Sequence, residues 1–168
     1  MKALKAFTLV EILVVVVLLG IMAVLVIPRL SGWTGAAKDS ALAHDLTMLR
    51  RYILVYKAQH LEVAPGYPDG DTSQTPTEQA FVEQITTSSN PRGQTAAVGT
   101  PGFERGPYLA RIPENPFNEK TSVQMLGDGE NFPVAADDQH GWIYKAATSE
   151  LRADNTGTDG TGKSYYDY

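Results

Sequence analysis

One stretch constrains this chain more than any other. Residues 7–27, FTLVEILVVVVLLGIMAVLVI, carry a single charge, which is that of Glu11. At a rise of about 1.5 Å per residue, an α-helix of this length covers roughly 30 Å, the thickness of the hydrocarbon core of a bilayer. In lipid only a helix or a closed barrel satisfies the hydrogen-bonding groups of the backbone. The stretch therefore predicts a membrane-spanning helix.

The carboxylate of Glu11 lies about one turn inside this apolar stretch, where an unpaired charge costs about 2.5–3.5 kcal/mol. The six residues before the stretch, MKALKA, contain two lysines and end in the small residue Ala6. A secretory signal would have its small-residue cleavage site after the apolar region, not before it. Cleavage between Ala6 and Phe7 would keep the apolar helix on the mature chain. It would also create an α-amine at Phe7, one helical turn from Glu11, and this amine is the counter-ion that the carboxylate lacks.

The short basic leader, the small residue, the FTLVE sequence, the apolar helix and Pro28 resemble the N-terminus of type IV pilins and of the pseudopilins of type II secretion systems. The resemblance implies that a membrane-embedded prepilin peptidase cuts after Ala6 and that Phe7 is N-methylated. It also implies that Glu11 pairs with the Phe7 amine of a neighbouring subunit as a filament assembles. The family usually has glycine in place of Ala6, so we expect slower cleavage of this chain.

An uncleaved signal anchor is the alternative for the same stretch, with Glu11 as a tolerated polar residue near the lipid headgroups. Both interpretations predict a single membrane pass. Lys2 and Lys5 precede the span and only Arg29 follows it closely, which by the positive-inside rule places the N-terminus in the cytoplasm. Together with the resemblance, this orientation predicts a bacterial inner-membrane protein whose C-terminal part lies in the periplasm.

A second helical pattern follows the apolar stretch. Apolar residues recur at spacings of three and four and form a stripe suited to packing against a domain: Leu42, Leu46, Leu49, Ile53 and Tyr56. We expect one long helix from Phe7 to about Leu61, with a kink at Pro28 and a second weak point at Gly20. The predicted organisation is a leader (1–6), a transmembrane and assembly helix (7–27), an amphipathic helical spine (28–62) and a periplasmic α+β head (63–168).

The head begins with turns and a short helix. The sequence Thr75-Pro76-Thr77-Glu78 has the form of a capping box, with proline at the first helical position and Glu78 reaching back to the N-cap amide. Ala80, Phe81 and Ile85 would form the buried face of this helix, and residues 88–102 read as a loop.

Strands are expected in the second half of the head. Residues 122–126 predict one strand and residues 141–154 a hairpin. Before them, GPYLARIPENPFN (106–118) contains three prolines and predicts an extended loop pinned by its apolar side chains. This loop resembles the corresponding segment of the major pseudopilin of type II secretion systems, which commonly has tryptophan and glycine where Phe117 and Asn118 stand. We expect an α+β fold, in which a small antiparallel sheet packs on the helical spine, as in pilins.

The C-terminal tail offers one candidate metal site. Asp154, Thr158, Asp159 and Asp167 supply oxygen atoms, the ligands that calcium prefers, on a flexible loop. Resemblance to the major pseudopilin, whose C-terminal loop holds a calcium ion, supports this interpretation. Two alternatives stay open. The acidic loop is simply solvated, or burial of aromatic side chains pins the tail without metal: Tyr165, Tyr166 and Tyr168.

Other chemistry finds little support in the sequence. A net charge of −5 argues against nucleic-acid binding, and the absence of cysteine excludes disulfides and thiolate metal sites. Three scattered histidines do not form an active site, and we expect His44 and His60 to be ordinary helix-surface residues, with His140 equally isolated. No nucleophile elbow, phosphate loop or zinc-peptidase motif occurs, so we expect a structural protein and not an enzyme.

The sequence thus predicts a structural subunit of a type II secretion pseudopilus. As the resemblance implies, a prepilin peptidase would process it, and an inner-membrane assembly platform with its ATPase would polymerise it with other pseudopilin subunits. The resulting periplasmic filament would drive protein secretion. Two alternatives remain: a type IV pilus subunit for DNA uptake or adhesion, and a membrane-anchored periplasmic binding module that does not polymerise.

Overall fold

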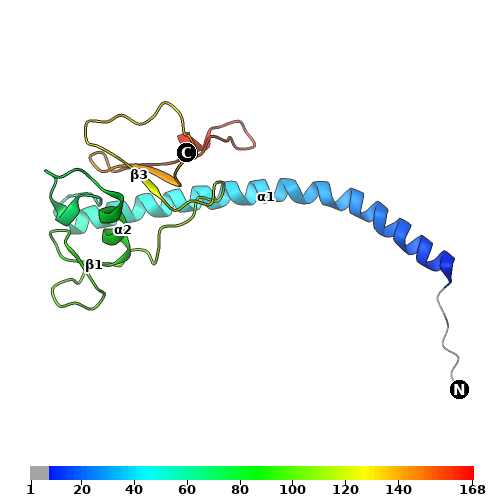
Figure 1. Cartoon of the computed structure of the whole chain (residues 1–168), viewed down its shortest axis with the longest axis horizontal. Helices are drawn as coiled ribbons and strands as arrows, with labels where there is room; N and C mark the ends of the chain where they lie inside the picture. Colours follow the sequence, from blue (N-terminus) through cyan, green and yellow to red (C-terminus); the bar gives the residue numbers. More distant parts are fainter. Residues whose placement is uncertain (1–7) are drawn as a thin grey trace, which may run out of the picture. The chain divides into compact units, whose positions relative to one another are not determined.

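The computed structural model describes residues 8–168, and of residues 23–34 it describes the backbone alone. The chain forms two compact units, Met1–Ala37 and Lys38–Tyr168. One helix, α1 (Leu9–Gln59), contributes to both units and begins and ends within two residues of the predicted limits (Figure 1). The backbone thus stays helical through Pro28, as the sequence predicted for a single long helix.

In the first unit, every described side chain from Leu9 to Met22 is exposed. Across the part of the chain that the structure describes, none of the helices has the length and apolar character that a bilayer crossing requires. The leader and Phe7 lie outside the described residues, as does the side chain of Pro28. The membrane span and the kinks at Pro28 and Gly20 therefore stay predictions.

In the second unit, the predicted apolar stripe of α1 is buried. Each member is at most 2% exposed and belongs to the main hydrophobic core: Leu42, Leu46, Leu49, Ile53 and Tyr56. Opposite them in the same core lie Trp142 and Tyr144. Full burial of one such side chain stabilises a fold by about 1.5–3 kcal/mol, so this stripe fixes the C-terminal half of α1 against the head. The interpretation of the stripe as the spine of the head is confirmed.

The short helix α2 (Glu78–Thr86) exists as predicted, but its cap differs. The N-cap is Thr77, whose hydroxyl accepts a hydrogen bond from the Ala80 amide at 3.2 Å. The Thr77 amide donates to the Gly66 carbonyl, which holds residue 77 outside the helix. Glu78 therefore does not reach back to Thr75; its carboxylate accepts instead from the Val123 amide at 2.7 Å. The predicted face is buried, together with Gln84.

Two small sheets follow α2. Strands β1 (Ser88–Ser89) and β2 (Thr95–Ala96) pair antiparallel within the segment that was expected to be a loop. The main sheet contains β3 (Val123–Leu126), β4 (Trp142–Lys145) and β5 (Glu150–Ala153) in that order. Single-turn 3-10 helices occur at η1 (Pro68–Gly70) and η2 (Tyr165–Asp167).

The main sheet is mixed, so the prediction of an antiparallel sheet is wrong in one pairing. Strands β4 and β5 form the expected antiparallel hairpin, whereas β3 runs parallel to β4. A parallel pair needs a connection of a dozen or more residues that returns to the same end of the sheet. The segment 127–141 is long enough for that return, and it passes over the sheet as a loop and not as a helix.

The two faces of this sheet are covered differently. Trp142 and Tyr144 point into the main core beside α1, whereas Ile143 forms a second cluster with Leu126 and Tyr166. Side chains of the 127–141 loop, Phe132 and Ala136, pack on this second cluster. The first three residues of β4 are therefore buried, and the loop acts as the outer layer of the sheet.

Candidate functional site

The N-terminal end of α1 is a reciprocal hydrogen-bonded cap. The amide and the hydroxyl of Thr8 donate to Oε2 of Glu11, at 2.8 and 3.0 Å. In return, the Glu11 amide donates to the Thr8 hydroxyl at 3.2 Å. This is a capping box, in which residues at the N-cap and three positions later satisfy each other's backbone donors. The sequence T-x-x-E carries this signal, and our sequence analysis missed Thr8.

The cap bears directly on the predicted pairing of Glu11. Both contacts from Thr8 reach Oε2, and among the described residues no hydrogen bond is made to Oε1. A carboxylate has about four lone-pair sites, so the capped side chain retains capacity for another donor. Phe7 lies outside the described residues, so its pairing with Glu11 stays a prediction.

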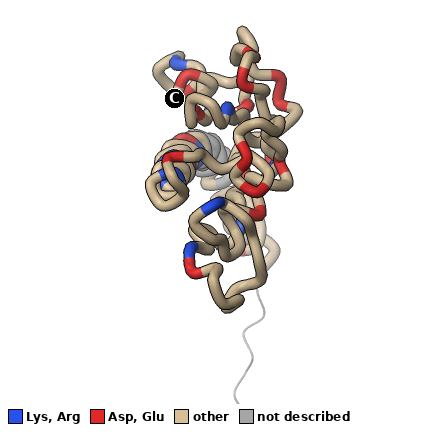
Figure 2. The backbone as a smooth tube through the Cα atoms, turned by 90° about the vertical axis from the view of Figure 1, so that its left-hand side faces the viewer, with Lys and Arg blue, Asp and Glu red and all other residues tan. Residues whose placement is uncertain are grey.

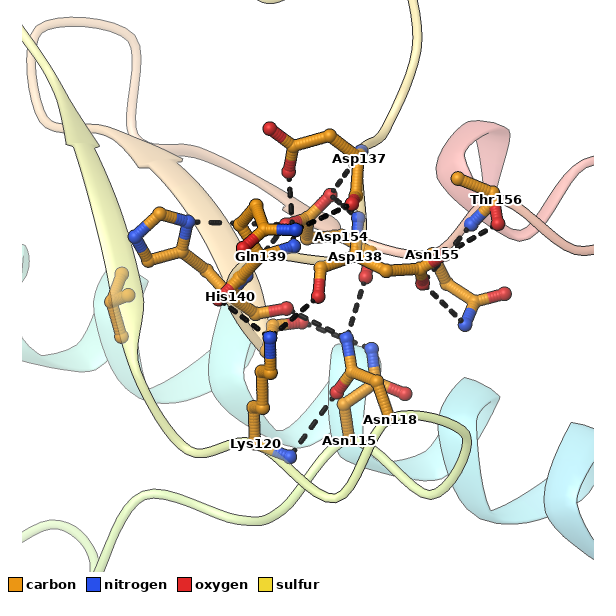
Figure 3. A network of polar contacts seen from close by, with 12 residues as sticks. Asn115, Asn118, Lys120, Asp137, Asp138, Gln139, His140, Asp154, Asn155 and Thr156 are labelled. Carbon is orange, nitrogen blue, oxygen red and sulfur yellow. Dashed lines mark hydrogen bonds and ion pairs between the residues drawn. The ribbon is translucent and has the colours of Figure 1, made fainter.

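In the head, Asp154 is the centre of a buried polar network (Figure 3). Its side chain is fully buried at the end of β5. The amides of Asp137 and Asp138 donate to Oδ1 at 2.9 and 3.2 Å, and the His140 amide donates to Oδ2 at 2.8 Å. Three backbone N–H groups thus satisfy a charge that would otherwise be costly to bury. The carboxylate thereby ties the end of the 127–141 loop to the C-terminal strand.

Neighbouring side chains extend the network to other segments. Asn118 donates to the carbonyls of His140 and Asp154, and Lys120 donates to the carbonyls of Asp138 and Gln139. The carboxylate of Asp138 accepts from Asn155 and from the Thr156 hydroxyl. Three separate segments, 118–120, 137–140 and 154–156, therefore meet at Asp154, and its role in the structure is that of a cross-link.

The tail itself is fastened in two further ways. Asp159 accepts from the hydroxyls of Thr161 and Tyr168, and these bonds hold the pKa of its carboxyl well below the usual range. The Tyr165 hydroxyl donates to Asp39 of α1, and Tyr165 and Tyr166 are buried. The alternative in which aromatic burial pins the tail agrees with this geometry.

The four predicted calcium ligands do not form a ready ligand shell. Asp154 accepts three backbone amides and Asp159 accepts donors within the tail itself, so the two carboxylates serve different networks. Thr158 lies in an isolated bridge with Ser164, and Asp167 is exposed in η2. Calcium ligands must offer free oxygen atoms, whereas the carboxylate oxygens of Asp154 and Asp159 already accept protein hydrogen bonds. The donor set therefore fits calcium poorly, and calcium binding stays a prediction.

A different trio of side chains lies close together in the described residues. Ligand atoms of Asp137, His140 and Asp154 fall within 4.8 Å of one another. The Nδ1 atom of His140 lies 3.9 Å from Oδ2 of Asp154, too far for a hydrogen bond. The amides of Asp137, Asp138 and His140 already donate to Asp154, so the turn that contains them accounts for the closeness of the three side chains.

Comparison with known proteins now defines the family. The chain is 30% identical over 134 residues to the type II secretion system core protein G of Klebsiella pneumoniae, which covers 80% of this chain and 82% of that protein. It is 29% identical over 146 residues to the protein of that name from Vibrio cholerae serotype O1, covering 84% of this chain and 86% of the relative. The chain belongs to the type II secretion system core protein G family. Its members are the G-type pseudopilins, so the predicted family is confirmed.

No family model matches the chain. No solved structure matches it either, so the pilin-like character of this pseudopilin's head stays a prediction.

One residue of this pseudopilin lies where the sequence did not place it. His60 was expected on the helix surface, but it is 1% exposed and lies in the turn after α1. Its ring stacks on Tyr56 with a centroid distance of 3.7 Å. One ring nitrogen lies 2.7 Å from the Tyr56 carbonyl and the other 2.9 Å from the Ser89 hydroxyl. A carbonyl only accepts, so Nδ1 carries the proton of the neutral ring and Nε2 accepts from Ser89.

Burial of His60 predicts that the pseudopilin loses stability in mild acid. Desolvation lowers the pKa of the imidazole below its usual value. Near pH 6.5 His60 therefore takes up a proton in the unfolded chain but stays neutral in the folded chain. The stability of the folded chain falls as the pH drops from 6.5 toward the folded pKa of His60. The slope contributed by this one group is at most about 1.4 kcal/mol per pH unit. Chemical denaturation of the detergent-solubilised protein between pH 7 and 5 measures it.

His60→Gln is the matched control, because glutamine retains hydrogen-bonding groups but does not titrate in this range. The variant should show a flatter pH profile than the unmodified protein. Equal slopes in the two proteins would assign the acid sensitivity to other groups.

Proposed function

We propose that this chain is a structural subunit of a type II secretion pseudopilus. A prepilin peptidase would cut it after Ala6 and methylate Phe7, and the subunits would then polymerise into a periplasmic filament. The observation that carries the proposal is the similarity to proteins named type II secretion system core protein G over most of both chains. The FTLVE sequence at the expected distance from Ala6 supports the processing step.

The exposed first unit supports assembly from the membrane. Every described side chain from Leu9 to Met22 faces outward, and nearly all of them are apolar. Exposed apolar surface of this extent needs lipid or other apolar helices around it. In the proposal, residues 7–27 cross the inner membrane while the subunit waits, and the helices bury one another once an assembly platform and its ATPase extract the subunits.

The capping box supplies a reason for the position of Glu11. The carboxylate satisfies the first turn of the helix through Oε2, and its charge still requires a cation in an apolar setting. The new α-amine at Phe7 of an adjacent subunit is a cation that only processed subunits possess. Pairing of this amine with Glu11 would therefore favour assembly of mature subunits over unprocessed ones.

The head would act as the outer layer of the filament. Its core fixes the C-terminal half of α1, so a force applied to the helix moves the head with it. Growth of the filament would push secreted proteins mechanically, and this role needs no catalytic group in the subunit.

The N-terminus of the native protein tests the proposal. We expect the intact mass and the N-terminal sequence of the protein, purified from its own membrane, to show a chain beginning at methylated Phe7. Ala6→Gly is the matched control and should be processed at least as fast. A chain that begins at Met1 in cells with active prepilin peptidase would instead favour the membrane-anchored binding module.

A further inference from the structure

The second unit leaves one face of α1 uncovered. Spacings of three and four place five residues on this face, which we term the Leu54 face: Thr47, Arg51, Leu54, Val55 and Ala58. Leu54 itself is 60% exposed, although the next residue but one along the chain, Tyr56, is fully buried in the core. Its C-terminal part, formed by Leu54, Val55 and Ala58, is apolar, and contact of this surface with water is unfavourable.

A second exposed apolar point lies on the loop that covers the main sheet. Val134 is fully exposed, and the residues on both sides of it are anchored. The Arg152 guanidinium lies 4.4 Å from the centroid of the Phe132 ring, and the Tyr166 hydroxyl donates to the Pro133 carbonyl at 2.7 Å. Ala136 packs on the second hydrophobic cluster. We term residues 132–136 the Val134 crest, in which these contacts hold one valine in solvent.

The charges beside these two surfaces are complementary. Acidic residues flank the crest on both sides, at Glu130 and at Asp137 and Asp138, and acidic positions gather on the loops in the upper part of Figure 2. The Leu54 face carries Arg51, which is exposed. Arg50 beside it is committed to the Leu151 and Tyr168 carbonyls, so Arg51 is the cation of this face that remains for an acidic partner.

We propose that the Val134 crest of one copy of this chain docks on the Leu54 face of the next copy. Both surfaces are exposed in the same molecule, so they do not cover each other within one chain. Two different, complementary patches on one protein make a head-to-tail contact, which repeats along a ring or a helical filament. The proposal rests on the polymerisation proposed above and assigns to it a specific contact between heads.

Cysteine cross-linking between chains tests this contact, and the chain contains no native cysteine that would interfere. Two full-length chains with different tags, one Leu54→Cys and one Val134→Cys, are expressed together in cells that assemble the filament, and mild oxidation follows. Any disulfide then joins two copies. We expect the 54–134 heterodimer to exceed by about tenfold or more the product of the matched pair Leu54→Cys with Val98→Cys, since proximity sets the effective concentration. Val98 is another exposed valine, on a different loop.

Two further measurements separate the outcomes. Arg51→Glu, added to the Leu54→Cys chain, should lower the 54–134 yield about threefold or more, because it opposes the acidic flanks of the crest. Filaments are counted in the same samples. Normal filaments with equal 54–134 and 54–98 yields, or with Leu54→Cys joined to a different protein, would overturn the docking contact and leave the proposed function standing. Absence of filaments from the unmodified chain would overturn the proposed function and the contact with it.

Discussion

Replacement of Glu11 by glutamine is expected to reduce filament assembly about tenfold or more while membrane insertion stays intact. Glutamine can still accept from Thr8, because capping boxes use either glutamate or glutamine at this position. The variant therefore keeps the helix cap and removes the charge alone. In the proposed filament this would leave the Phe7 amine of a neighbour without its counter-ion, and breaking one side of a buried ion pair costs about 3–5 kcal/mol.

Thr8→Ala is the matched control for this experiment. It removes the side-chain half of the cap, at a cost of about 0.5–2 kcal/mol for the helix end, and leaves the Glu11 charge in place. Sheared filaments are counted by electron microscopy, and membrane fractionation reports insertion. If Thr8→Ala proves as damaging as Glu11→Gln, the cap and not the charge is what assembly requires.

Replacement of Asp154 by alanine is expected to destabilise the head by about 3 kcal/mol or more. The variant leaves three backbone amides of the 137–140 turn, which are partly buried, without their acceptor; at about 1 kcal/mol each, the lower end of the cost of an unsatisfied donor, they account for the expected loss. For a unit of this size, a loss of this magnitude lowers the melting temperature by about 10 °C. Thermal unfolding of the detergent-solubilised protein, followed by near-ultraviolet circular dichroism, measures it.

Asp137→Ala lies in the same turn and is the control. Its exposed carboxylate accepts only from the Gln139 amide in the described structure, so its loss should cost less than about 1 kcal/mol. The same melts are repeated in EGTA and in millimolar calcium. The Asp154 oxygens already accept three backbone amides, so an unchanged melting temperature in calcium would contradict the predicted calcium site. A rise of several degrees would instead establish a calcium site, since calcium at about 100 times its dissociation constant stabilises by about 2.7 kcal/mol.

Periodicity accounts for most of the fold that was predictable. The stripe from Leu42 to Tyr56 repeats often enough to define its buried face, and Trp142 to Tyr144 form a strand because their side chains favour one. His60 extends the same stripe, four positions after Tyr56. The spacing thus indicated that His60 is buried, but a polar side chain is expected on a helix surface, and for that reason its burial was not predicted.

Other features depend on contacts between distant segments. No local pattern indicates that Glu78 caps β3 instead of its own helix, since Val123 lies 45 positions away. The amides that surround Asp154 come 14 to 17 positions before it and are backbone groups, which every residue possesses. The sequence also did not decide the direction of β3 relative to β4, because a loop as long as 127–141 permits either a parallel or an antiparallel pairing. The capping box at Thr8 is the exception, since its motif is local and recognisable.

Because the chain is synthesised from its N-terminus, the apolar stripe of α1 is made before the strands that bury it. The guanidinium of Arg50, on the spine, binds the carbonyl of Leu151, and these residues are 101 positions apart in the chain. At about 5–20 residues per second, roughly 5–20 s separate the emergence of the spine from that of the strand that covers it. During that time the leucine side chains of the stripe are uncovered and can aggregate. A nascent subunit therefore needs either a chaperone that binds the exposed stripe, or slow encounters with other nascent chains.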